Sequence, residues 1–307
     1  MTMNKILNIA FALAFAVLFV ACNPIEKDFG TGEVVTSTDQ LNVTITPVMF
    51  KTYKTNKYKV QCKSPVVCKW STTASYISND TTVLLLGKGA QNIKLTAMAA
   101  DGSLLTKTYS VTVDSLYYPV PPQWGYLCGS SSKTWVWATD VTGTAFPGAA
   151  AGKCYGNGGY LANNSPGWWT CGLSDLTGWG VANDKMTFSL DGASMTLVTG
   201  NSQTAGKGLA AGTYGGTYSF DMSKTKASSS PPSASNSNTY AIGQLTLSGV
   251  TVSLGFQPNV SGYPSIYTYD ILYLDNNIMV LEAPEPSTTG AWGTAWFWVF
   301  KRQGYSF

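Results

Sequence analysis

The chain has 307 residues, a formal net charge of +3, 11% charged residues and 13% aromatic residues. A net charge this close to zero argues against a nucleic-acid partner, because that function needs a strongly basic surface. Histidine is absent, which excludes Ser-His-Asp and Cys-His nucleophile systems and every metal site that depends on histidine. The many Gly, Ser, Thr, Asn and Tyr residues indicate an all-β extracellular protein, and no motif predicts a cofactor or a metal.

Residues 1–21 have the pattern of a secretory signal peptide. Lys5 precedes a run over residues 6–20 in which Asn8 is the only polar residue, so a charged region leads into a short apolar one. A membrane-spanning helix needs about 20 apolar residues, and this run is shorter. We therefore expect these residues to direct export and then to be removed.

The cysteine that follows the apolar run predicts a lipid anchor. Ala21 directly before Cys22 resembles the cleavage site of lipoprotein signal peptidase, so we expect a lipid on Cys22 and a polar tether over residues 22–38. Stable anchoring takes more than one acyl chain, and bacterial lipoproteins of this type carry two or three. The alternative is an ordinary secretory peptide beside an incidental cysteine.

Residues 39–115 predict a small sandwich of antiparallel strands. Apolar and polar side chains alternate, as around Tyr58 and Val60, and turns rich in Gly and Asp separate the alternating segments. A central Trp70 and the run KTYSVTV at residues 107–113 resemble PKD-like and other immunoglobulin-like modules. The resemblance implies a spacer domain.

A proline-rich connector at residues 117–122 separates this unit from a larger one at residues 123–307, because proline restrains the backbone and removes hydrogen-bond donors. In the larger unit, residues 186–192 alternate into an Asp-Gly turn, and residues 269–282 predict a second hairpin. No segment with the period of a helix stands out. We expect an antiparallel β-sandwich, jelly-roll-like, or an open barrel.

Five cysteines remain if Cys22 carries a lipid, so at least one thiol is free or pairs outside the chain. Cys62 and Cys68 lie on consecutive predicted strands and are one candidate disulfide. Cys154 and Cys171 are the other candidate pair. The cysteine spacings match no zinc site.

Nine of the ten tryptophans lie in residues 123–307, which is more than one core needs. An indole has an apolar face and a polar N–H, so an exposed indole suits the C–H face of a sugar ring. The tryptophans in loop-like sequence are the predicted glycan platforms: Trp168, Trp169, Trp179, Trp292 and Trp124. The alternative for each is an indole packed under its own loop. Tryptophans that alternate along predicted strands are expected in the core.

Polar side chains close to these tryptophans in sequence could bond to sugar hydroxyl groups. The predicted partners are Asn163, Asn164 and Asp184. The alternative for each is a turn residue, because Asn and Asp hydrogen-bond readily to the backbone of turns.

Hydrolysis of a polysaccharide needs two carboxyl groups that face one glycosidic bond. Residues 123–307 contain nine acidic residues, several of them in predicted turns. The Glu-x-Asp-x-x-Glu pattern of family 16 glycoside hydrolases is absent. We therefore expect a protein that is not an enzyme, with a glycoside hydrolase as the alternative.

Four short motifs resemble a family of surface glycan-binding lipoproteins from glycan-degrading Gram-negative bacteria. They are GSSSKTWVW at residues 129–137, the pair Trp168-Trp169, NDKMTF at residues 183–188 and the late hairpin at residues 269–281. In this family a PKD-like module precedes a β-rich carbohydrate-binding domain.

The resemblance implies noncatalytic polysaccharide binding that supports glycan capture for uptake. It also implies a lipid anchor in the outer membrane, an orientation toward the cell exterior and a partnership with an outer-membrane sugar transporter complex. A structural or adhesive surface lipoprotein without a sugar ligand is the remaining alternative.

Overall fold

The computed structural model describes residues 34–202, 207–228, 239–288 and 292–307. Strands dominate these residues and the described helices are short, which confirms the all-β prediction. The predicted signal peptide, Cys22 and most of the tether lie outside the described residues. No helix within the described ranges is both long enough and apolar enough to cross a membrane.

The first unit is a sandwich of two antiparallel sheets, with strand orders β1-β2-β5 and β4-β3-β6-β7. Its core includes Val60, Trp70 and Leu95, which alternate with exposed residues as the sequence pattern predicts. The indole N–H of Trp70 donates to the carbonyl oxygen of Ser78 at 2.9 Å, so the buried ring keeps a polar partner. The elements are η1 (Thr38–Gln40), β1 (Val43–Phe50), β2 (Tyr53–Cys62), β3 (Val67–Ser71), β4 (Ser75–Ile77), β5 (Asp80–Leu84), β6 (Gly89–Met98) and β7 (Leu104–Val113).

The second unit contains two short helices and twelve strands within the described residues. They are α2 (Pro122–Cys128), β8 (Ser132–Trp137), β9 (Tyr155–Gly159), β10 (Trp169–Cys171), α3 (Leu173–Gly178), β11 (Lys185–Ser189), β12 (Ser194–Thr199), β13 (Gly212–Asp221), β14 (Lys226–Ala227), β15 (Thr239–Ala241), β16 (Gly243–Ser248), β17 (Thr268–Leu274), β18 (Ile278–Pro284) and β19 (Thr294–Arg302). The 3-10 turn η2 (Asp191–Ala193) joins β11 to β12.

Eight of these strands form a closed antiparallel barrel in the order β8-β11-β12-β13-β16-β17-β18-β19. The ring closes where Phe300, Lys301 and Arg302 of β19 pair with Trp137, Val136 and Trp135 of β8. The sequence left a sandwich or an open barrel as the expected architectures, and the observed unit is a closed barrel. Closure pairs the two edge strands, whose unpaired backbone groups would otherwise face solvent.

Strand β19 has two partners along one edge. Its first half, from Thr294 to Trp298, pairs with β9, and only its last residues pair with β8. Strand β10 pairs in turn with β9. The pair β9–β10 therefore extends the barrel wall beyond the closed ring.

Helix α2 closes one end of the barrel, because it packs against β8, β11 and β17, which lie on different sides of the ring. The ammonium group of Lys133 holds the helix there by donating to the carbonyl oxygen of Gly125 at 3.2 Å and to that of Tyr126. The opposite end is where β18 ends, β19 begins and residues 249–267 connect β16 to β17. We call this end the barrel mouth.

Aromatic side chains fill the barrel interior. Trp298 and Tyr269 are fully buried, and their rings meet edge to face with centroids 5.2 Å apart. Trp135 and Trp137 are also buried, so these strand tryptophans belong to the core as predicted. In the described residues the interior of the barrel is a packed core of buried side chains.

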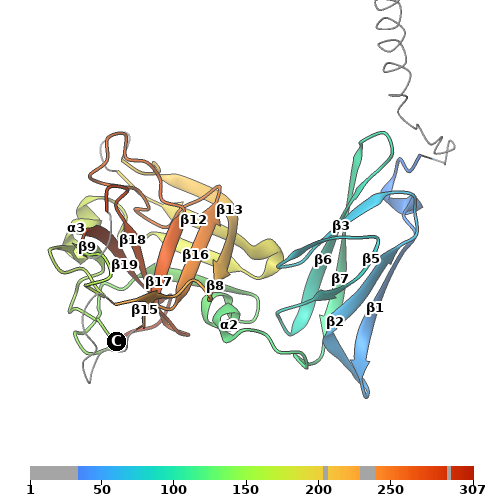
Figure 1. The fold of residues 1–307 in the computed structure, drawn as a ribbon, viewed down its shortest axis with the longest axis horizontal. Helices are drawn as coiled ribbons and strands as arrows, with labels where there is room; N and C mark the ends of the chain where they lie inside the picture. The colour runs from blue at the N-terminus through green and yellow to red at the C-terminus, as the bar shows by residue number, and fades with distance from the viewer. Residues whose placement is uncertain (1–33, 203–206, 229–238, 289–291) are drawn as a thin grey trace, which may run out of the picture.

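The two units meet at the closed end of the barrel. The hydroxyl of Thr73 donates to the carbonyl oxygen of Leu190 at 3.0 Å, and the amide of Asn92 donates to the carboxylate of Asp191 at 3.4 Å. Both acceptors lie at η2, which is at the α2 end because β11 finishes there beside the start of β8. The mouth consequently lies at the end of the barrel away from the first unit (Figure 1).

Candidate functional site

A cavity of ≈ 90 Å³ opens at the barrel mouth, and we call it the mouth pocket. Strands β9, β10 and β19 supply one aromatic residue each to its walls, α3 ends at another, and the loops at the mouth supply the rest. The lining residues are Tyr155, Trp169, Trp179, Lys207, Phe256, Pro258, Tyr263 and Trp296. A largely aromatic cavity in the mouth of a β-barrel is a common position for a ligand site.

The indoles of the mouth pocket range from buried to exposed. Trp296 forms the floor and is almost fully buried, whereas Trp169 at the rim is 46% exposed. The rings of Trp169 and Trp179 are offset-stacked at 26° with centroids 6.1 Å apart, and Trp169 meets Trp296 edge to face at 5.9 Å. Tyr155 stacks on Trp296 at 5.5 Å. These contacts hold the exposed ring of Trp169 in a fixed orientation.

The local sequence of β9 explains how Trp169 reaches this position. Asn157 pairs with Trp169 of β10 on one side and with Trp296 of β19 on the other, so the two indoles share one face of the sheet. The side chain of Asn157 also accepts a hydrogen bond from the backbone N–H of Trp169 at 2.9 Å. A Cβ on neighbouring Gly156 would lie 2.1 Å from the carbonyl oxygen of Trp169, so β10 can approach only because this residue is glycine.

Polar groups are few and lie around the aromatic walls. The ammonium group of Lys207 lies 5.2 Å from the centre of the Tyr263 ring. The carboxylate of Glu285 accepts from the indole N–H of Trp296 at 3.0 Å and from Asn259 at 2.6 Å. The hydroxyl of Tyr155 is buried and has no hydrogen-bond partner among the described residues, which is unusual for a native structure.

Two other predicted platforms lie close to the mouth pocket. Trp168 is 53% exposed and Trp292 is 56% exposed. Both indoles lie against Gly159, the last residue of β9. Four of the five predicted tryptophans are thus gathered around β9, β10 and the end of α3.

Trp124 lies elsewhere. It belongs to α2 and packs against Phe220 at 4.4 Å and Tyr218 at 5.8 Å, at the closed end of the barrel. It is half-buried, and the structure does not bring it together with the other predicted platforms.

The predicted polar partners make local structural contacts. Asn163 accepts a hydrogen bond from the N–H of Gly159 at 2.7 Å, and the side chain of Asn164 lies against Gly148. Asp184 is buried and accepts from the N–H of Gly200 and the hydroxyl of Ser253. Burial raises the pKa of Asp184 although these hydrogen bonds oppose the shift. None of the three lines the mouth pocket.

Six further residues complete the pocket, and the sequence did not single them out: Tyr155, Lys207, Phe256, Pro258, Tyr263 and Trp296. Trp296 shares the strand alternation of Trp298, and both were expected in the core. Trp296 differs from Trp298 only in lying nearer the start of β19. That position identifies it as a pocket residue only when the location of the barrel mouth is known.

The five cysteines in the described residues are buried, and the structure contains them in the reduced form, without a disulfide between them. The thiols of Cys62 and Cys68 lie within hydrogen-bonding distance of one another, and burial raises the pKa of Cys68 to about 12. Burial also raises the pKa of Cys154 and of Cys171 to about 12. Thiols with such values are poor nucleophiles, and both disulfide pairs stay predictions.

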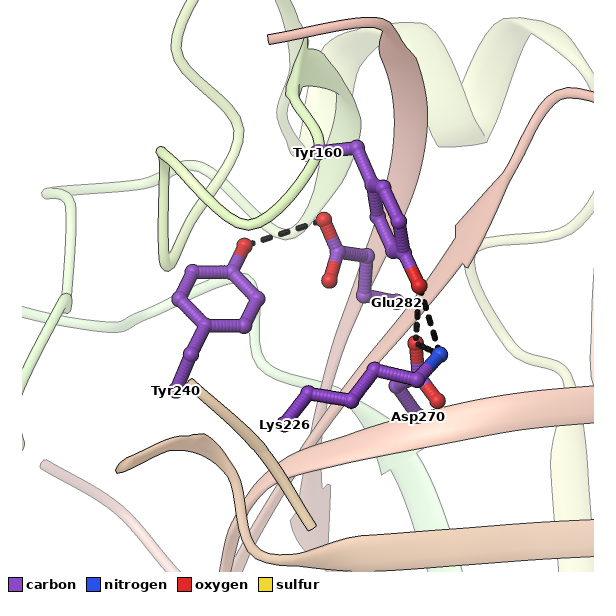
Figure 2. Close-up of polar contacts among 5 residues, drawn as sticks. All are labelled: Tyr160, Lys226, Tyr240, Asp270 and Glu282. Carbon is purple, nitrogen blue, oxygen red and sulfur yellow. Dashed lines mark hydrogen bonds and ion pairs between the residues drawn. The ribbon is translucent and has the colours of Figure 1, made fainter. Parts of the chain in front are cut away.

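A second group of polar side chains lies at the barrel wall, and we call it the acid cluster (Figure 2); its members are Tyr160, Lys226, Tyr240, Asp270 and Glu282. Asp270 of β17 and Glu282 of β18 are directly opposite one another and are 3% and 0% exposed. Lys226 donates to the Asp270 carboxylate at 2.6 Å and to the hydroxyl of Tyr160 at 2.5 Å. The hydroxyl of Tyr240 donates to Glu282 at 2.9 Å.

The two carboxyl groups of the acid cluster have different surroundings, since Asp270 is paired with Lys226 and Glu282 is hydrogen-bonded to Tyr240. Burial, with the nearby charge of Asp270, raises the pKa of Glu282 to about 9, although Tyr240 and Lys226 oppose the shift. Burial lowers the pKa of Lys226, but its hydrogen bonds to Asp270 and Tyr160 outweigh that effect and raise it. Near neutral pH the cluster therefore holds an ion pair beside an uncharged carboxylic acid. These contacts fasten β14, β15 and the loop after β9 onto β17 and β18.

No protein-family model and no curated protein matches this chain. Within the described residues no group of three or more Cys, Asp and Glu side chains is arranged to hold a metal ion. The family resemblance therefore depends on the sequence motifs alone.

Replacing Glu282 by Gln should flatten the dependence of stability on pH. The folded-state pKa of about 9 lies above the ordinary value of 4.5, so the stabilisation from the bound proton is complete below about pH 4.5 and is lost as the pH rises toward 9. Gln keeps an acceptor for Tyr240 and carries no charge. Urea unfolding followed by tryptophan fluorescence across this range should show a smaller fall in the free energy of unfolding for Glu282→Gln than for the unchanged protein.

Asp39→Asn is the control, because the Asp39 side chain is 90% exposed, and it should leave the slope unchanged. Equal slopes for Glu282→Gln and the unchanged protein would contradict the assignment of an uncharged Glu282.

Proposed function

We propose that this chain binds a glycan noncatalytically at the mouth pocket. The observation that carries the proposal is the half-exposed indole of Trp169, held beside Trp179 above a floor formed by Trp296 and Tyr155. The C–H face of a sugar ring packs on such an indole while its hydroxyl groups stay solvated. A fixed ring loses little conformational freedom when a ligand binds.

The dimensions of the pocket favour a ligand that lies across it. A cavity of ≈ 90 Å³ is smaller than the about 300–1,000 Å³ that encloses a drug-sized ligand. Part of one sugar fits inside, and the remainder rests on the rim. An open arrangement of this kind suits a polysaccharide better than a small apolar molecule, which gains affinity from full enclosure.

Donor groups beside the aromatic walls support the same conclusion. Lys207 and Asn259 both carry N–H groups near these walls.

The sequence motifs support a role at the cell surface. Their resemblance to surface glycan-binding lipoproteins implies an anchor on Cys22, a position on the outer membrane and cooperation with a sugar transporter complex. On this proposal the first sandwich is a spacer, and the mouth, at the far end of the barrel, meets the polysaccharide.

One observation favours hydrolysis as a second candidate function. Asp270 and Glu282 are adjacent carboxyl groups, Asp270 is paired with Lys226 and the pKa of Glu282 is raised to about 9, and glycoside hydrolases use two carboxyl groups in different environments as base and acid. Both groups are buried, and Lys226 already occupies the Asp270 carboxylate. A substrate would have to displace that ion pair, so noncatalytic binding is the better supported function.

Replacing Trp169 or Trp179 by Ala should weaken glycan binding at least about tenfold, or about 1.4 kcal/mol, because each change removes a ring that contacts the sugar. The measurement is affinity gel electrophoresis against soluble β-glucan, xylan, mannan and starch. Tyr53→Ala, at an exposed aromatic residue of the first unit, should migrate as the unchanged protein does. Unchanged retardation in the tryptophan variants, or no retardation by any polysaccharide, would favour the adhesive alternative.

Replacing Tyr155 by Phe should stabilise the protein. The change removes a buried hydroxyl without a partner in the described residues, which relieves a desolvation cost. Thermal unfolding should shift upward. A variant with lower thermal stability would show that the hydroxyl has a structural role.

Incubation of the purified protein with the same polysaccharides should release no reducing ends. Hydrolysis at the acid cluster predicts the opposite result and its loss in Asp270→Asn. Reducing ends that appear with the unchanged protein and disappear in Asp270→Asn would replace the binding proposal by the enzymatic one.

A further inference from the structure

Two exposed indoles continue the aromatic surface beyond the mouth pocket. A Cβ placed on Gly159 would lie 2.9 Å from Cε3 of Trp292 and 3.3 Å from Cζ2 of Trp168. The two indoles therefore occupy the space that a side chain at residue 159 would take. Each of the two residues is more than half exposed, so the pair forms a platform over the end of β9.

The backbone at Trp292 is held in an unfavourable conformation. Its φ of 67° lies in the left-handed region, which is uncommon for a bulky residue. The N–H of Trp292 donates to the carbonyl oxygen of Tyr160 at 2.9 Å, and the N–H of Tyr160 donates to that of Gly293 at 2.7 Å. These two bonds fix an exposed indole where it gains little burial. Strain retained without a packing benefit is a feature of functional sites.

The platform and the mouth pocket lie in one row along β9. Asn157 is the residue opposite Trp169 and Trp296. Gly159 is the next residue on the same face, about 7 Å further along an extended strand. The row therefore leads from the pocket, past Trp169, to the Trp168–Trp292 platform.

We infer that Trp168 and Trp292 form a second sugar subsite, and that the ligand is a linear glycan of several linked sugars. This inference rests on the proposed function, because it takes the mouth pocket as the first subsite. A single sugar that fills the mouth pocket leaves the platform unused. A chain that continues along β9 covers both aromatic groups at once, and the two contacts then act together through one molecule.

The inference predicts a loss of affinity that depends on chain length. Trp292→Gly is the main variant, because it removes the indole and also relieves the positive φ, so its thermal stability should equal or exceed that of the unchanged protein. The probes are oligosaccharides of two to six sugars from whichever of β-glucan, xylan, mannan or starch retards the protein, measured by titration calorimetry. Affinity for the unchanged protein should rise with length, and Trp292→Gly should lose about tenfold for the longest probe while its affinity for the disaccharide stays the same.

Trp168→Ala should repeat this pattern, whereas Trp169→Ala should weaken binding of probes of every length. Equal affinities for short and long probes, or an equal loss at every length in Trp292→Gly, would overturn the second subsite and leave the mouth pocket in place. Failure of all four polysaccharides to retard the protein would remove the proposed function itself, so the two failures are distinguishable.

Discussion

The division of β19 between two partner strands is the constraint on which the candidate site depends. The barrel closes through Phe300, Lys301 and Arg302 at the end of β19, and the first half of the same strand stays available for β9. If β8 paired along the whole of β19, β9 and β10 would have no edge to join. Trp169 would then be absent from the mouth, and Trp296 would lack the ring that covers it. The short pairing between β8 and the end of β19 thus closes the barrel and leaves an edge for the strands that supply the aromatic rim.

The glycines of β9 allow this arrangement by their lack of side chains. Gly156 lets β10 approach closely, and Gly159 leaves room for two indoles. The acid cluster holds the end of β9 in place, because Tyr160 directly follows β9 and is hydrogen-bonded to Lys226 and Asp270. Strand β9, against which the row of tryptophans lies, is therefore fixed at both faces, although glycine weakens strands in general. Rigid support of this kind is what a binding surface requires.

Local patterns in the sequence were sufficient for part of this structure. Strand alternation identified the all-β class and the buried Trp135, Trp137 and Trp298, and loop chemistry identified the exposed Trp168. Closure of the barrel was not predictable, because it depends on pairing between segments at opposite ends of the second unit, where no turn sets the register. The Asp270–Glu282 pair depends on a bulge, because the register at the turn, with Leu274 opposite Met279, shifts by one residue between Ile271 and Tyr273 before Asp270 comes opposite Glu282. Lys226, which pairs with Asp270, lies far from it in the sequence, and no local sequence pattern predicts the contact.

Helix α2, which closes one end of the barrel, has a consequence for how a polymer would be recognised. Because one end of the barrel is covered by α2 and the described interior is packed, the proposed site is an outer surface, and no terminus of a bound chain needs to enter the barrel. The proposed surface along β9 would grip the middle of a polysaccharide as readily as its tip. Many copies of the protein could then hold a single long or cell-wall-embedded polymer side by side, and the combined attachment would outlast any individual contact.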